Sequence, residues 1–551
     1  MFEELVAKKI AEQTTLEEEQ VLELIEIPPD ESLGDYAFPC FVLAKELKKA
    51  PLIIAQELAE KITDELFVKV EAKGPYINFF IKPGAWTRQL SSFTQRLWSP
   101  FLDEKVLLEY PSPNTNKPLH LGHVRNMVLG STVYKVLSRA GAQVVQVNLN
   151  NDRGVHICKS MLAYKLWGSN QEPDKKSDHF VGDWYVRFAK EAEQDPSLNE
   201  QAQEMLQRWE EGDEEVLTLW KKMNSWAYTG WQETFKEFSV SFDKEYYESD
   251  IYSEGKKLVL DNKSLFEVDD GAVVADLDDY KLPKKVLLRR DGTSIYITQD
   301  LALTLKKEEE FSPDKQVWIV GNEQELHFRQ LFAILDLLGY PKKNYFHLSY
   351  GMIELPSGKM KSREGSVVDA DDLLSEVKVL AEKNIRERQE WPEKKVQAVA
   401  HSVALAAIRF FIIKYDPVKG FVFHPEKSLS FEGDTGPYLQ YTHARISRIL
   451  EKAGYQHQET TIELGVEEVV VCKAVSGLRQ AFVEAASNYK PHLIAQQLLV
   501  LGRAINSYYH STPVLQAEQD VQDMRLMFLY EVRAVLAQGL SLLGIDAPKE
   551  M

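Results

Sequence analysis

The sequence predicts an α/β protein: a central domain with a parallel sheet and an insertion, a small α+β domain before it, and an all-α helical bundle after it. Residues 103–370 alternate apolar, strand-like runs with helical patterns, residues 1–102 mix a few of both, and residues 371–551 are almost entirely helical in pattern. At 551 residues the chain is also too long for a single core, so several domains are expected.

The amino-terminal domain is predicted from one helix signal and one strand signal. Pro51 begins a helical pattern that continues through Leu58, in agreement with the preference of proline for the first helical turn. Residues 74–81 alternate like a strand. Together these signals indicate a small α+β module.

The central domain begins with a strand, a polar turn and a helix. Residues 106–108 form an apolar run, residues 113–123 form the polar turn, and residues 124–139 have helical periodicity. A second predicted strand at residues 144–149 ends in the polar segment 150–154. Ligands of parallel sheets lie beyond the carboxyl ends of the strands, so these two turns are a candidate site.

A charged, aromatic and mainly helical stretch at about residues 170–285 interrupts this alternation, and we interpret it as an insertion that splits one parallel sheet. The alternation then returns. Strands are predicted at residues 286–288, 317–320 and 346–353, helices between them at 299–306 and 326–338, and further helices at 403–413, 439–450 and 493–508.

Composition predicts a soluble protein of the reducing cytoplasm. The chain has neither an uncharged apolar run long enough to cross a bilayer nor a signal-peptide core near its first residues, so we expect no membrane partner. Its three cysteines lie far apart and predict neither disulfides nor a metal site. A net charge of −19 argues against indiscriminate coating of nucleic acid, but a local basic face can still bind it.

The polar turn carries two histidines, His120 and His123, at a helical spacing that places them on one face. Gly122 lies between them and allows a ligand to approach the backbone. The positive end of the following helix favours phosphate, and the imidazoles can donate to oxygens that gain charge in a transition state. The alternative is an ordinary helix start with two surface histidines.

A second candidate element is the glycine-bounded, strongly basic segment at residues 357–366, which contains Lys359, Lys361 and Ser362. Lysines on a movable loop can neutralise a triphosphate as it reacts. The alternative is an exposed charged turn. Since both elements adjoin strands of the same predicted sheet, their combination favours a nucleotide site.

These residues resemble a known family. The run from His120 to His123 resembles the first signature of class I aminoacyl-tRNA synthetases, and the run from Lys359 to Ser362 resembles a shortened form of the second. Residues 109–118, 291–300 and 431–445 resemble arginyl-tRNA synthetases in particular. The resemblance spans nearly the whole chain. It implies a Rossmann-like catalytic domain at residues 103–370, an amino-terminal domain at 1–102 that binds the outer corner of tRNA, and an anticodon-binding bundle at 371–551.

The resemblance implies an arginine–tRNA ligase that works in two steps. ATP and L-arginine give arginyl-adenylate and pyrophosphate, and the arginyl group then moves to the terminal adenosine of tRNA(Arg). Magnesium would accompany ATP as counter-charge, without a cage of protein ligands. Similarity also implies a monomer, and a requirement for bound tRNA in the activation step.

By similarity, the catalytic residues are His120, His123 and Lys361. The shortened second signature lacks one residue between its lysines, so Lys359 could take the catalytic place instead. We favour Lys361 because Ser362 follows it. Some family members rely on a lysine just before the histidine turn, where this chain has Lys117. The expected ATP-binding residues are Lys117, His120, Gly122, His123, Lys359, Lys361 and Ser362.

Similarity also implies an arginine pocket. A guanidinium is best held by carboxylates in planar, bidentate geometry. Tyr296 and Asp300 are four residues apart at a helix start and can share a face. Three of the pocket residues also have ordinary alternatives: core packing for Tyr296, a solvated or capping acid for Asp300, and an exposed polar residue for Gln324. The expected arginine-binding residues are Glu109, Asn114, Tyr296, Asp300 and Gln324.

For tRNA, the resemblance points to a predicted helix that mixes aromatic and basic side chains. Bases can stack on the aromatic rings, and arginines can meet phosphate, although ordinary bundle helices also carry such mixtures. The expected tRNA-binding residues are Tyr438, Tyr441, Arg445 and Arg448, with His443 beside them.

Three other functions are weighed against this one. A cysteinyl enzyme of the same class is disfavoured by the acidic pocket formed by Glu109 and Asp300. An inert RNA-binding relative is expected to lack the histidine turn or the basic segment. A nucleotidyltransferase for a small metabolite has no use for the helical end and the amino-terminal module.

Overall fold

The computed structural model describes residues 2–28, 30–87, 90, 93, 101–354, 356, 368–457 and 464–551. The chain divides into two compact units, and we describe each by itself. The smaller unit consists of Met1–Arg96, Ile449–Gly477 and Arg503–Val535, and the larger unit consists of Leu97–Arg448, Leu478–Gly502 and Leu536–Met551.

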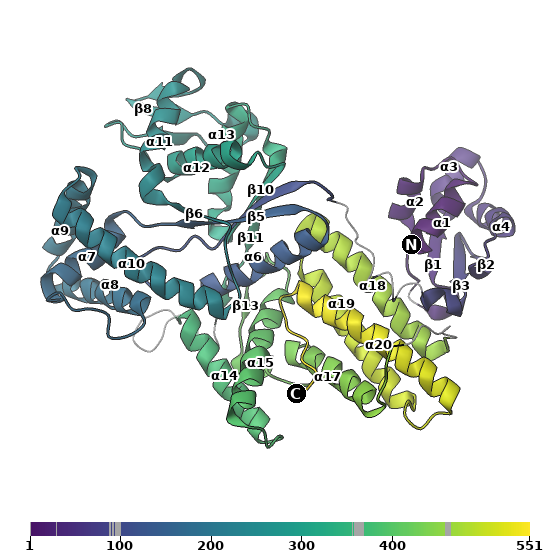
Figure 1. Ribbon diagram of the computed structural model, residues 1–551. Coiled ribbons are helices and arrows are strands. Elements are labelled where there is room, and N and C mark those ends of the chain that lie inside the picture. Colours follow the sequence, from purple (N-terminus) through teal and green to yellow (C-terminus); the bar gives the residue numbers. More distant parts are fainter. Residues whose placement is uncertain are drawn as a thin grey trace. The chain divides into compact units, whose positions relative to one another are not determined.

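The smaller unit contains a three-stranded antiparallel sheet with helices packed on it (Figure 1). Helix α4 (Pro51–Lys61) begins at its proline, and a strand occupies most of the predicted range 74–81, so both predictions are confirmed. Phe2, which begins α1 (Phe2–Ala11), packs edge-on against Trp86 in the core. Across the sheet the strands are β1 (Tyr36–Pro39), β3 (Tyr76–Ile81) and β2 (Phe67–Lys73), and α2 (Glu18–Leu24) completes the module.

The larger unit is built on a five-stranded parallel sheet, which confirms the predicted fold class (Figure 1). The chain starts in the middle at β4, moves outward through β5 and β6, and returns on the other side of β4 with β10 and β11. The carboxyl ends of β4 and β10 are therefore a topological switch point, where open parallel sheets bind ligands. The strands are β4 (Lys105–Glu109), β5 (Gln143–Asn150), β6 (Lys244–Tyr247), β10 (Lys315–Gly321) and β11 (Tyr345–Tyr350).

Three helices bring the candidate site to this edge. Helix α6 (Leu121–Arg139) connects β4 to β5, α12 (Tyr296–Phe311) precedes β10, and α13 (Glu325–Leu337) connects β10 to β11. A helix that joins parallel strands runs back along the sheet, so each of these helices begins near the carboxyl ends of the strands.

The predicted insertion at 170–285 needs two corrections. Strand β6 lies inside that range but is an edge strand of the main sheet, paired with β5. The predicted strand at 286–288 belongs instead to a separate antiparallel sheet of β7 (Glu267–Asp269), β8 (Ala272–Ala275) and β9 (Lys285–Leu288). The helices of the insertion before β6 are α8 (Ser177–Gln194), α9 (Ser197–Glu210) and α10 (Glu214–Glu237), and α11 (Glu248–Asp261) follows β6. Helix α7 (Val155–Trp167) precedes the insertion and packs against α8 and α9.

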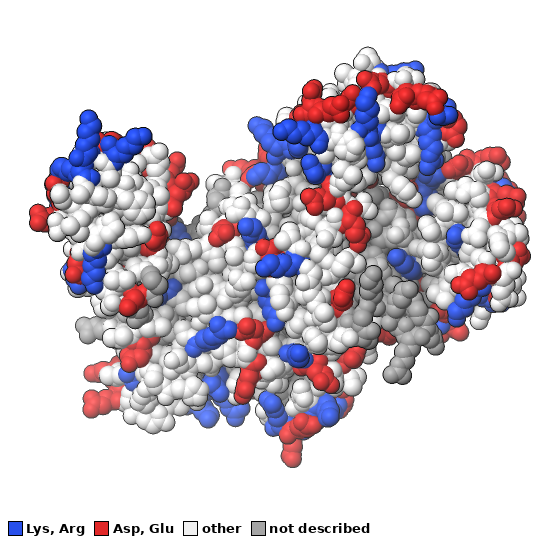
Figure 2. Space-filling view, turned by 180° about the vertical axis from the view of Figure 1, so that it is seen from behind, with Lys and Arg blue, Asp and Glu red and all other residues white. Residues whose placement is uncertain are grey.

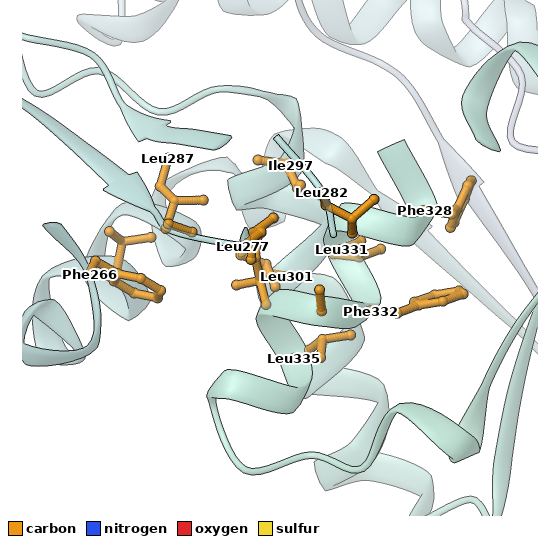
Figure 3. Packing of buried hydrophobic residues seen from close by; sticks show 14 of the residues in the cluster. Phe266, Leu277, Leu282, Leu287, Ile297, Leu301, Phe328, Leu331, Phe332 and Leu335 are labelled. Atoms are coloured by element: carbon orange, nitrogen blue, oxygen red, sulfur yellow. The ribbon is translucent and has the colours of Figure 1, made fainter. Parts of the chain in front are cut away.

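The small antiparallel sheet shares a hydrophobic core with α11, α12 and α13 (Figure 3). Leu287 of β9 packs with Leu301 of α12 and Leu331 of α13, and none of the three side chains has measurable contact with water. Burial of each such side chain contributes roughly 1.5–3 kcal/mol. This core fixes the two helices whose amino-terminal ends carry Asp300 and Gln324.

The carboxyl-terminal region is helical, as predicted, and the predicted helices 403–413, 439–450 and 493–508 all lie within observed ones. Helix α15 (Glu393–Ile413) is long and apolar enough to cross a membrane, but 67% of its most apolar window is buried in the protein. Its Arg409 is buried and donates to Ser131 Oγ of α6 at 3.1 Å. The other long helices are α14 (Ala370–Arg386), α17 (Gly436–Lys452), α18 (Val466–Asn488), α19 (His492–Ser511) and α20 (Gln519–Leu542).

Candidate active site

Helix α6 begins at the turn that carries the two predicted histidines. His120 precedes the helix, and its Nδ1 accepts a hydrogen bond from the backbone N–H of Gly122 at 3.1 Å. The backbone N–H of His120 donates to Nδ1 of His123 at 3.0 Å, and the two rings stack with centroids 3.8 Å apart. Because each Nδ1 accepts, each neutral ring carries its proton on Nε2, which is then the donor for a ligand.

Burial sets the charge of these imidazoles. Together with a smaller contribution from the nearby Lys117 ammonium, it lowers the pKa of His120 to about 4. Burial also lowers the pKa of His123, with contributions from His120 and Lys117. Both rings are therefore neutral at pH 7, and each can offer a ligand a hydrogen bond but not a positive charge.

Lys117 lies on the turn just before the histidines, where the sequence predicted an ATP contact. Burial lowers its pKa. Its backbone carbonyl accepts a hydrogen bond from Trp231 Nε1 at 3.2 Å, which ties the turn to α10 of the insertion. The position suits a phosphate that approaches the start of α6.

The predicted second signature, Lys359, Lys361 and Ser362, lies outside the described residues, but both flanks of that segment are described. On the near side, β12 (Ile353–Glu354) pairs with β13 (Phe421–Val422), and Arg125 of α6 donates to Met352 O at 3.2 Å. On the far side, Val368 O accepts from Leu121 N at 3.0 Å. Both flanks are thus bonded to α6.

The predicted arginine-pocket residues fall into two groups. Asp300 lies near the start of α12, and His327 Nε2 of α13 contacts its carboxylate at 2.6 Å. Tyr296 begins α12 and is 75% exposed, so its ring is available to a ligand. Asn114 follows β4, and Gln324 ends the short 3₁₀ helix η6 (Asn322–Gln324) after β10, so both lie beside the switch point.

Glu109 is placed differently from the other pocket residues. It ends β4 inside the protein, where its carboxylate forms an ion pair with Lys307, whose side chain is fully buried. The Lys307 ammonium also lies 5.1 Å from the ring centroid of Trp318. A substrate guanidinium would have to compete with this internal cation for Glu109, whereas Asp300 is partly exposed.

Further carboxylates lie near Asp300, and sequence reasoning missed them. The pKa of Glu248, at the start of α11, is raised to about 7, mainly by burial, with smaller contributions from the charges of Asp152 and Asp300 and an opposing one from Arg153. Asp152 accepts from Ser249 N at 2.9 Å. An incoming cation would relieve this repulsion, which gives the edge of the sheet the electrostatics of a guanidinium site.

The predicted tRNA-binding residues lie on α17, with different exposure. Tyr441 and Arg448 are exposed, and the Arg445 guanidinium lies 5.0 Å from the Tyr441 ring centroid. Tyr438 is partly buried. His443 is buried and bonds to Pro548 O at 2.8 Å, so it does not share the exposed face expected for it. On the face that Figure 2 shows, Lys and Arg are interspersed with Asp and Glu, in keeping with local rather than general attraction of nucleic acid.

Comparison with known proteins identifies this arrangement. Residues 94–424 match the family described as tRNA synthetases class I (R), catalytic domain. The chain belongs to the arginyl-tRNA synthetase family. Residues 1–81 match the arginyl tRNA synthetase N terminal domain, and residues 439–551 match the DALR anticodon binding domain.

Relatives of this arginyl-tRNA synthetase chain match it over nearly its full length. An arginine–tRNA ligase of Treponema pallidum is 39% identical, over 96% of this chain and 95% of that protein. The solved structure of Thermus thermophilus arginyl-tRNA synthetase is 29% identical, with a TM-score of 0.86 and complete coverage of both chains. A Plasmodium falciparum arginyl-tRNA synthetase shares the fold at 16% identity, with a TM-score of 0.79 over 96% of this chain and 94% of that one. Family membership decides against the cysteinyl alternative.

Proposed function

We propose that this chain catalyses the ATP-dependent attachment of L-arginine to tRNA(Arg), through arginyl-adenylate. The observation that carries the proposal is one sheet edge with two kinds of chemistry. Neutral imidazole donors at the start of α6 suit phosphate oxygens, and the partly exposed Asp300 carboxylate on α12 suits a guanidinium.

In the first step, a carboxylate oxygen of arginine attacks the α-phosphorus of ATP. The bond from that phosphorus to the bridging oxygen of the pyrophosphate breaks, and pyrophosphate leaves with the electron pair. Negative charge grows on the phosphate oxygens, where Nε2–H of His120 and of His123 donate. Because each Nδ1 already accepts a backbone N–H, Nε2–H is the donor that each neutral ring has left for a phosphate oxygen.

The remaining phosphate contacts are assigned to the two lysine-bearing segments. Lys117 precedes the histidines, and Gly122 adds no side chain where a phosphate would approach the start of α6. We assign Lys361 to the leaving pyrophosphate, with Lys359 and Ser362 beside it, by similarity of the signature. Magnesium enters with the nucleotide as counter-charge on its phosphates.

Arginine is recognised by Asp300, with Tyr296 on the same face of α12 and Asn114 and Gln324 in the turns after β4 and β10. His327 supports the Asp300 carboxylate from α13. Glu109 contributes through the field of its pair with Lys307, and binds the guanidinium directly only if it exchanges that partner. Lysine cannot satisfy a planar fork, and citrulline would leave the acid without a cation.

In the second step, a ribose hydroxyl of the terminal adenosine attacks the arginyl carbonyl carbon, and AMP leaves. We assign residues 1–102 to the outer corner of the tRNA and residues 371–551 to the anticodon. Tyr441 and Arg448 are exposed on α17, and the partly buried Arg445 lies beside the Tyr441 ring with Tyr438 at the edge of this face. Bound tRNA is required for activation in this proposal, because it shifts the site to its competent arrangement.

Amino-acid-dependent exchange of pyrophosphate into ATP tests this function. It should occur with arginine and not with lysine, citrulline or cysteine, and only when tRNA(Arg) is present. Exchange with a neutral amino acid but not with arginine would overturn the assignment. Exchange with arginine in the absence of tRNA would overturn the coupling alone.

We also propose that the protein acts as a cytoplasmic monomer. All three of its cysteines are free and buried, as suits a reducing compartment. Light scattering at micromolar concentration should give the mass of one chain, about 63 kDa. A dimer mass would contradict this proposal.

A further inference from the structure

A cluster of charged side chains joins the helical insertion to the start of α14. Lys176, the residue before α8, donates to Asp371 Oδ2 at 2.6 Å, to Thr234 Oγ1 at 2.5 Å and to Asp178 Oδ2 at 3.3 Å. His179 Nε2 contacts the same Asp371 oxygen at 2.9 Å. The cluster therefore links three helices that lie far apart in the sequence: α8, α10 and α14.

Asp178, His179 and Asp371 also lie close enough together to hold a metal ion. However, the ammonium group of Lys176 already contacts both carboxylates, and the Asp178 side chain is completely buried. A second cation would have to displace that lysine. The cluster is therefore a charge-balanced link between helices.

The link leads directly to the catalytic turn. Asp369 caps α14, and its backbone is bridged to His120 in antiparallel fashion. Leu121 N donates to Val368 O at 3.0 Å, and Ala370 N donates to Leu119 O at 2.8 Å. The segment 368–371 thus has the histidine turn on one side and the charge cluster on the other.

The insertion contacts the histidine turn by a second route. A Cβ atom on Gly182 of α8 would lie 2.7 Å from Pro118 Cδ, so only glycine permits this close approach. The indole of Trp231 on α10 donates to the Lys117 carbonyl. Helices α8 and α10 therefore contact both Lys117 and Pro118, just before the two histidines, and Asp371, next to the segment that is bridged to His120.

We propose that Lys176 and His179 are positioning residues for adenylate formation, which hold the 368–370 segment against the histidine turn through Asp371. This inference rests on the proposed function and assigns the insertion a role in it. Neither side chain touches substrate. Their effect is on the orientation of His120, which must meet the α-phosphate within a few tenths of an ångström to be effective.

His179 makes the link sensitive to pH. Its hydrogen bond to Asp371 raises the pKa of His179, and the charges of Asp369, Asp178 and Asp371 act in the same direction against burial. Lys176 is the neighbouring cation. The protonated ring is the form that binds these acids, so the link is complete below the raised pKa and weakens as the pH rises through it.

The test is arginine-dependent pyrophosphate exchange by the full chain with tRNA, in which wild-type activity first establishes the proposed function. Lys176→Met and Asp371→Asn should each lower kcat at least about 10-fold while the KM for arginine stays within about twofold. Lys176→Arg should recover most of the rate. The matched control is Lys175→Met, since the adjacent Lys175 pairs only with the exposed Asp183 among the contacts described.

The pH dependence of kcat distinguishes a positioning role of His179 from a role in stability alone. The wild-type kcat should fall at alkaline pH with the titration of His179, and His179→Gln should remove that limb and have a uniformly lower rate. Thermal melting measures the folded fraction of each variant. Folded Asp371→Asn and His179→Gln with wild-type kcat and an unchanged pH profile would overturn the proposal, whatever becomes of Lys176→Met.

Discussion

The ammonium group of Lys307 is bonded to the carboxylate of Glu109 inside the sheet domain, 198 residues away along the chain. Both side chains are almost completely withdrawn from water. Lys307 lies two turns after Asp300 on α12, so the two residues are roughly 10 Å apart along the helix at 1.5 Å per residue. At this edge of the sheet, the Glu109 carboxylate is therefore neutralised by Lys307, whereas the Asp300 carboxylate is partly exposed.

Removing one partner of this ion pair should lower the free energy of unfolding. Lys307→Met leaves the Glu109 charge buried without a counter-ion, so the free energy of unfolding should fall by about 3–5 kcal/mol. Equilibrium urea unfolding measures this. The double variant Glu109→Gln, Lys307→Met should regain much of the loss. The control Lys306→Met removes a partly exposed pair with Glu254 and should cost less than about 1 kcal/mol. Equal costs for Lys306→Met and Lys307→Met would contradict the assignment.

Asp300→Asn should specifically impair the use of arginine. It keeps the shape of the side chain but removes the charge partner of a desolvated guanidinium, a loss of about 2–3 kcal/mol, or roughly 30–150-fold in kcat/KM for arginine. Pyrophosphate exchange at varied arginine and varied ATP measures both constants, and the KM for ATP should hardly change. Asp279→Asn, an exposed carboxylate of the small antiparallel layer, is the control. An unchanged kcat/KM for arginine in Asp300→Asn would remove Asp300 from the pocket.

His120 should stay neutral well below the usual range for histidine. With a pKa of about 4 in the folded protein, against about 6.5 in a free peptide, the unfolded chain binds more protons between these values. The contribution of His120 therefore makes the fold less stable as the pH falls from 6.5 towards 4. Titration of the imidazole NMR signals measures the pKa, with His120→Asn to assign the resonance and the urea-unfolded chain as reference. A midpoint near 6.5 in the folded protein would refute the assigned neutral state.

The cysteines should be inert in the folded protein. Burial raises the pKa of Cys40 to about 11 and that of Cys158 to about 12, and it raises that of Cys472 as well. Since the thiolate is the reactive form, a disulfide reagent at pH 8 should label none of them within minutes, and all three after denaturation. Rapid labelling of any cysteine in the native protein would contradict this prediction.

Local patterns were sufficient for the elements that define the site. The apolar run at 106–108, the polar turn and the following helical period predicted β4, the histidine turn and α6. In each of these segments the residues follow a single pattern. Pro51 likewise marked the start of α4. Where hydrophobic period and local signals agree, the sequence determines the element without its neighbours.

The same local patterns did not predict which strands pair with each other, or which distant side chains form ion pairs. Strand β6 reads Lys244, Glu245, Tyr246, Tyr247, and its mixed polarity suits the edge of a sheet but gives no apolar run. Strand β9 has such a run, yet pairs with β8 in another sheet. The spacing of Tyr296 and Asp300 predicted their shared face, but nothing local indicated that Glu109 has Lys307 as a partner. The cluster around Asp371 depends on three distant segments in the same way.

The glycine at position 182 limits how chimeras of this enzyme can be made. Because Pro118 fills the space that any larger residue would need, the inserted helices and the nucleotide turn have complementary surfaces that must be exchanged as a set. A chimera that takes residues 155–247 from a relative but keeps the resident turn would join two surfaces never selected for each other. The inserted helices are thus shaped to fit the turn before α6, and replacing them alone is a poor route to a hybrid enzyme.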